Sequence, residues 1–70
     1  MRKHRYRITI RGVLGEAGRE AFEHFKIEPD GINTALISDL DQAGLYGALY
    51  RIQALGLELL ALSRPAGPEY

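Results

Sequence analysis

Histidine and carboxylate side chains are the groups in this chain that could bind a metal or transfer protons. The chain has two histidines, His4 and His24, and no cysteine. Glu20 and His24 are four residues apart, a spacing that places both side chains on one face of a helix. Two ligands fall short of a metal site, and no pair of carboxylates lies in an obviously buried segment, as acid–base catalysis would require. The sequence therefore predicts no metal, no cofactor and no catalytic residue, and it favours a role other than catalysis.

Glycines and tyrosines suggest a second kind of site, for a small ligand. Gly12, Gly15 and Gly18 precede or begin a predicted helix, where free backbone amides attract anions. Tyr46 and Tyr50 are four residues apart and could line a cleft between helix and sheet. We therefore consider, as an alternative function, a small-molecule binding or enzyme domain with a pocket between helices and sheet formed by Gly12, Gly15, Tyr46 and Tyr50. The alternative is a turn that needs positive backbone angles, together with tyrosines that cover the edge of the core.

Basic residues are concentrated at the start of the chain. Nine basic and nine acidic residues give a net charge of zero. The basic residues that come before the first acidic residue are Arg2, Lys3, Arg5, Arg7 and Arg11. Arginines bind phosphates, but a neutral chain attracts nucleic acid weakly at long range, and the outward positions of this segment carry no aromatic ring. We therefore expect no nucleic-acid partner and keep binding through a basic sheet face as an alternative.

Alternation of side chains predicts a half-buried strand over residues 4–11, ended by Gly12. The inward face carries Tyr6, Ile8 and Ile10, and the outward face carries Arg5, Arg7, Thr9 and Arg11. Residues 14–25 have apolar side chains at helical spacing, which predicts a short amphipathic helix that starts near Gly15.

A turn at Pro29-Asp30-Gly31 separates two further strands. The first surrounds Ile27, and its proline confines it to an edge of the sheet. The second covers residues 33–40, with Leu36 and Leu40 directed inward.

A second helix begins at Asp41, whose carboxylate can cap the first turn, and ends at Gly56 in the left-handed conformation. Within it, Gly44 and Gly47 each cost about 1 kcal/mol relative to alanine. We expect a neighbouring helix or the sheet to approach these glycines closely, and a ligand against bare backbone is the alternative. A last strand follows over residues 57–64.

The order of elements is strand, helix, strand, strand, helix, strand. This order is typical of the ferredoxin-like βαββαβ plait, an α+β fold with a four-stranded antiparallel sheet and two helices on one face. We expect residues 1–64 to form a single domain and residues 65–70 to form a flexible tail.

The uncovered face of this sheet is the predicted partner surface. It would carry Arg5, Arg7, Arg11, Ile37, Glu58, Leu60 and Leu62. A surface that mixes apolar and charged groups suits a second copy of the chain, with arginine paired to acid at the rim. A chain this short buries only about 60% of its unfolded surface and has no disulfide, so association would stabilise it. We therefore predict a homodimeric interaction or regulatory module, with another protein or a small ligand as further candidate partners and a simply solvated face as the alternative.

The composition is that of an ordinary globular protein, with 46% hydrophobic and 26% charged residues. Charged residues interrupt the apolar segments, and the N-terminal residues do not resemble a signal peptide. We expect a cytoplasmic protein without membrane contact.

Two resemblances add to these predictions. Residues 41–59 read DQAGLYGALYRIQALGLEL and resemble a DQAxLYGxLxRIxxLGLxL motif of small uncharacterised actinobacterial proteins, which implies no assigned activity. The likeness is strongest over residues 33–62. More loosely, the order of elements and the glycines at 12, 15 and 18 are similar to ACT-type regulatory domains, which bind small amino acids beside a glycine in the first strand-to-helix connection. That resemblance implies a regulatory role.

Overall fold

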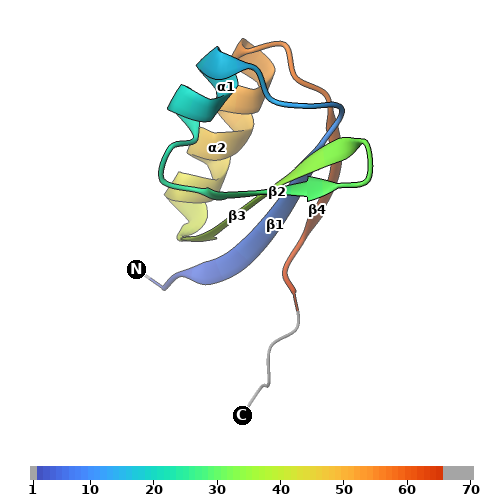
Figure 1. The fold of residues 1–70 in the computed structure, drawn as a ribbon. Helices are drawn as coiled ribbons and strands as arrows, with labels where there is room; N and C mark the ends of the chain where they lie inside the picture. Colours follow the sequence, from blue (N-terminus) through green and yellow to red (C-terminus); the bar gives the residue numbers. More distant parts are fainter. Residues whose placement is uncertain (1, 66–70) are drawn as a thin grey trace.

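The computed structural model describes residues 2–65 as an antiparallel sheet with two helices on one of its faces (Figure 1). The elements are β1 (His4–Ile10), α1 (Glu16–Ala21), β2 (Lys26–Asp30), β3 (Asn33–Leu40), α2 (Gln42–Ala54) and β4 (Leu59–Ser63). The strands lie in the order β2-β3-β1-β4. The predicted α+β architecture, a four-stranded antiparallel sheet with two helices, is confirmed. Residues 66–70 of the expected tail lie outside the described residues.

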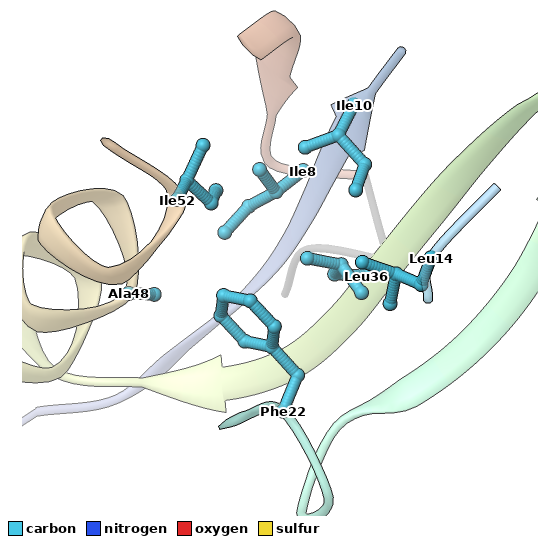
Figure 2. Close-up of a cluster of buried hydrophobic side chains, with 7 residues drawn as sticks. All are labelled: Ile8, Ile10, Leu14, Phe22, Leu36, Ala48 and Ile52. Atoms are coloured by element: carbon cyan, nitrogen blue, oxygen red, sulfur yellow. The ribbon is translucent and has the colours of Figure 1, made fainter. Parts of the chain in front are cut away.

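The core lies between the helices and the inward face of the sheet (Figure 2). Its buried residues are Ile8, Ile10, Leu14, Phe22, Leu36, Ala48 and Ile52. The alternation predicted for the first strand is confirmed, because Ile8 and Ile10 are fully buried and Ile8 is opposite Leu36 of β3. Leu40 packs against the edge of this cluster, as its predicted inward position requires.

Helix α1 is shorter than its periodicity predicts. It starts after Gly15 as expected but ends at Ala21, and Phe22 already has non-helical backbone angles. Since β2 begins at Lys26, the chain uses residues 22–25 to turn from helix to strand. Within this turn the rings of Phe22 and Phe25 meet edge to face, with centroids 5.2 Å apart.

Helix α2 begins and ends where its sequence predicts. Asp41 Oδ1 accepts a hydrogen bond of 2.7 Å from the Gly44 N–H and so caps the first turn. At the other end Gly56 has φ +73°, and Leu57 N–H donates to Ile52 O, which completes a Schellman motif. No helix within residues 2–65 is long and apolar enough to cross a membrane.

The two glycines inside α2 have different explanations. A Cβ atom at Gly44 would lie 3.2 Å from Asp41 Oδ1 and 3.3 Å from Leu40 Cδ2, so the glycine leaves room for the cap. The close neighbours are thus the capping residue and the last residue of β3, so at Gly44 the sheet does approach closely, as predicted. A Cβ atom at Gly47 would meet nothing within 4 Å, and the packing explanation is wrong for that residue.

Candidate functional site

The face of the sheet that the helices leave uncovered, called the open face below, carries the outward side chains of β1. Arg5 is opposite Asp39 of β3, and Arg7 is opposite Ile37. Directly opposite residues of neighbouring strands point to the same side of a sheet. The predicted outward row of arginines therefore lies on the open face, beside Ile37.

Arg5 forms a bidentate ion pair with Asp39. Its Nε atom is 2.9 Å from Asp39 Oδ1, and its Nη2 atom is 3.2 Å from Oδ2. The hydrogen bonds from Arg5 hold the pKa of Asp39 below its ordinary value, and the charges of Arg5 and Lys3 act in the same direction. Both groups are exposed, so this pair is a surface feature that water and salt screen.

Arg7 reaches across β3 to the edge strand β2. Its guanidinium lies 3.6 Å from a Glu28 oxygen and 3.7 Å from an Asp30 oxygen. Because adjacent strands are about 4.8 Å apart, the backbones of β1 and β2 are roughly 10 Å apart, so the Arg7 side chain extends over β3 and meets the carboxylate side chains of β2. Ala35 of β3 lies on this path and is fully buried although it belongs to the open face. We attribute its burial to the aliphatic stem of Arg7.

Arg11 completes the row through an ion pair of 3.2 Å with Glu58. Arg5, Arg7 and Arg11 are therefore all matched by acids of their own chain, and Lys26 joins them by pairing with Glu28 at 3.1 Å. The acids that could pair with arginines of a partner at the rim, Asp39 and Glu58, are therefore already paired within the chain. Glu28 and Asp30 were not predicted as partners of the arginines. Their alternate positions in β2, which place both side chains on one face, could have indicated this role.

Strand β4 differs from its predicted alternation because it contains a β-bulge. Thr9 of β1 pairs with Ala61, but the next residue, Ile10, pairs with Leu59, so Leu60 is an extra residue. Leu62 is consequently opposite Ile8 and lies on the side that the helices occupy. The predicted position of Leu62 on the open face is wrong, and Ala61 and Ser63 take that side instead.

β4 remains the most exposed apolar part of the sheet. It lies at one end of the strand order and so pairs on one side only. Leu59, Leu60 and Leu62 are each between 42% and 44% exposed, and no residue of the strand is buried. Three leucines in a row of five residues form an apolar edge, which we call the β4 edge.

The predicted ligand residues do not come together. Gly12 follows the end of β1, with φ +77°, and its N–H donates to Asn33 Oδ1 (3.1 Å) while its carbonyl accepts from Thr34 Oγ1 (2.7 Å). Gly15 is extended and begins α1, so the need for a positive φ explains Gly12 and not Gly15.

Tyr46 and Tyr50 lie on the exposed side of α2, 59% and 71% exposed. Tyr46 lines a hollow of about 440 Å³ together with His4 and Arg64, near the start of β1. Because Gly12 lies beyond the opposite end of β1, one pocket cannot contain both the glycines and the tyrosines.

Inside this hollow, Arg64 Nη2 is 2.8 Å from His4 Nδ1. A guanidinium can only donate, so Nδ1 must accept and the ring proton is carried on Nε2. Tyr46 Oη accepts from Gln42 Nε2 at 3.3 Å on the other side of the hollow. The hollow is thus lined by hydrogen-bonding groups of both β1 and α2.

Fold and site together define a small α+β protein whose sheet has one helix-covered face, one face crossed by ion pairs, and one apolar edge. The chain belongs to the family described as Domain of unknown function (DUF8691), whose model matches residues 5–63. Comparison with curated proteins and with solved structures found no match. Family membership therefore assigns no function, and functional inference depends on the chemistry of the surface.

Proposed function

We propose that the protein is a non-enzymatic interaction module that acts in the cytoplasm as a homodimer and regulates through its association. The observation that carries this proposal is the β4 edge, with three leucines between 42% and 44% exposed on a strand that pairs on one side only. The strand order β2-β3-β1-β4 with two helices on one face supports classification as a ferredoxin-like plait. The looser resemblance to ACT-type domains would fit a regulatory role, and the resemblance to small actinobacterial proteins implies no activity.

The charges of the sheet support an apolar rather than an electrostatic contact. Arg5, Arg7 and Arg11 are each held by carboxylates of the same chain. Binding of nucleic acid through this face would require these ion pairs to open, and the net charge of zero supplies little compensating attraction. The leucines of β4, by contrast, gain free energy from any contact that removes them from water.

Sedimentation velocity over a range of micromolar concentrations tests this proposal. We expect a reversible monomer–dimer equilibrium that Leu62→Asp shifts toward monomer, because a carboxylate at a buried contact loses its hydration. Ile32→Asp serves as the matched control, since Ile32 is exposed at the tip of the β2–β3 hairpin and away from β4. A wild-type chain that stays monomeric over the whole range would contradict the proposal.

A second candidate function, binding of a small anion, is favoured by the hollow beside His4. Its lining combines the basic side chains of Arg2, His4 and Arg64 with the hydroxyl of Tyr46, and includes no carboxylate among the described residues. Guanidinium groups recognise carboxylates and phosphates through paired hydrogen bonds. The chemistry therefore suits a small carboxylate or phosphate compound.

A thermal-shift screen against amino acids and phosphorylated metabolites tests this second candidate. A stabilising compound should lose its effect in Arg64→Ala and keep it in Arg19→Ala, since Arg19 is on α1 and does not line this hollow. Cooperative melting without a shift for any compound would count against a ligand at this position.

A further inference from the structure

The backbone of β4 has hydrogen-bonding groups that the sheet does not use. Arg11 N–H donates to Glu58 O at 2.9 Å, so the backbone of Arg11 faces β4. Alternate residues of an antiparallel strand face the same neighbour, so Thr9 also faces β4, and its partner Ala61 faces β1 in return. Leu62, the next residue, therefore turns its N–H and C=O away from β1. These groups point to the free side of the sheet.

The opposite edge of the sheet is blocked at the corresponding place. Asp30 and Asn33 flank a two-residue turn and face each other, so the residue before Asp30 faces outward. That residue is Pro29, which has no N–H to offer. The side chains that β2 places on the open face are the charged Lys26, Glu28 and Asp30. Proline and charge are the usual protection of an edge strand, and β4 has neither between Leu59 and Ser63.

The charges at the ends of β4 favour a second copy of the same strand. Glu58 precedes the strand and Arg64 follows it. Glu58 is paired with Arg11 of its own chain, so no ion pair across the contact is needed; antiparallel pairing places the acidic end of one β4 beside the basic end of the other, whereas parallel pairing would bring like charges together. With a net charge of zero, two copies have no overall repulsion to overcome.

We propose that two copies of the chain associate by antiparallel pairing of their β4 edges, so that the two sheets become one continuous sheet. This inference rests on the proposed homodimeric function and specifies its geometry. The contact is isologous and closes at two copies, because Pro29 and the charges of β2 protect the remaining outer edges. Backbone hydrogen bonds through Leu62 hold the two strands together, and the exposed leucines pack across the junction.

Amide hydrogen exchange of the unmodified full chain, followed by NMR, tests the proposal directly. The Leu62 N–H lacks a partner in the sheet of one chain, so it should exchange rapidly at low protein concentration. In the paired dimer it donates across the junction and should become protected as concentration rises. The Ala61 N–H faces β1 and should be protected at both concentrations, which makes it an internal control.

A pair of variants gives a second test. Leu62→Pro removes the outward donor without removing a hydrogen bond to β1, and Leu62→Ala removes the same apolar contact but keeps the donor. We expect the dimer dissociation constant of Leu62→Pro to exceed that of Leu62→Ala by about tenfold or more. Circular dichroism verifies that both variants are folded, and if Leu62→Pro is not, the exchange experiment decides alone.

The outcomes separate this geometry from the proposed function. Concentration-dependent protection of Leu62 supports edge pairing. A dimer in sedimentation whose Leu62 amide exchanges freely would overturn edge pairing and leave a homodimer that uses another surface. A monomer at every concentration would overturn both.

Discussion

The two edge strands of the sheet, β2 and β4, solve the same structural problem in opposite ways. Both pair with one neighbour and leave one side open. β2 reads Lys-Ile-Glu-Pro-Asp: its charged side chains lie on one face, and its proline is at a position whose backbone is directed to the free edge of the sheet. β4 reads Leu-Leu-Ala-Leu-Ser and has neither charge nor proline. The difference teaches that only one end of this sheet is suited to pair with another strand.

The largest effect should come from giving β2 the character of β4. The double variant Glu28→Leu/Pro29→Val gives β2 a backbone N–H directed to its free side and removes one charge. Both edges of each sheet can then pair with another strand. Molecules in which both edge strands can pair form open-ended polymers rather than closed dimers. Light scattering should show large particles, whereas Ile32→Val at the hairpin tip should not change the size distribution. Unchanged particle size in the double variant would mean that edge chemistry does not control assembly.

A charge placed on β4 should have the next largest effect. Leu60→Lys adds to this strand the kind of residue that protects natural edges, because an ammonium must lose water when two strands pair. We expect the dimer dissociation constant to rise about tenfold or more, which sedimentation equilibrium measures. Ile32→Lys makes the same change at an exposed site away from β4 and should leave the constant unaltered.

A smaller effect, on stability alone, separates folding from association. Gly47→Ala places a methyl group where nothing lies within 4 Å, and it should raise the free energy of unfolding by about 1 kcal/mol. Gly44→Ala should gain less or lose stability, since its Cβ would contact Asp41 Oδ1 at 3.2 Å. Urea denaturation of both variants measures the difference. Neither should change dimer formation, and equal gains would contradict the role assigned to Gly44.

The smallest effect should come from the open face. Asp39→Asn removes the carboxylate whose pKa the Arg5 hydrogen bonds lower. A group with a lowered pKa in the folded state stabilises the fold above its unfolded pKa, about 3.9, and loses this contribution as the pH falls through the folded value. The variant should therefore be slightly less stable than wild type at neutral pH, and the difference should vanish in acid.

This same variant distinguishes the open face from the β4 edge. If β4 is the contact, Asp39→Asn should leave the dimer intact at neutral pH. Dissociation of the dimer in sedimentation would instead identify the open face as the interface, and the contrast between the two edge strands would lose its functional meaning.

The fold was predictable where local chemistry decides it. Asp41 can cap a helix through its own carboxylate, and Gly56 can end one because it tolerates a positive φ. The strand over residues 33–40 matches its prediction because a turn with Gly31 and a cap at Asp41 delimit it on both sides. Each of these signals acts within a few residues, so the sequence alone contains it.

The site was less predictable because it depends on register between distant segments. Nothing near Arg7 in the chain indicates that Glu28 and Asp30 will lie within reach two strands away. The bulge in β4 is another such case, since period-two counting from Glu58 places Leu62 on the wrong face. Whether Tyr46 and Gly12 could line one pocket likewise depended on the end of β1 at which each residue lies.

The bulge also leaves Leu60 without a partner residue in β1. Residues on either side of it keep their faces without it, because Leu59 pairs with Ile10 and Ala61 pairs with Thr9. A chain shortened by this one residue would retain the same inward and outward sides in an unbroken strand. The register of β4 with β1 on either side of this point therefore does not depend on Leu60, whose side chain is 43% exposed.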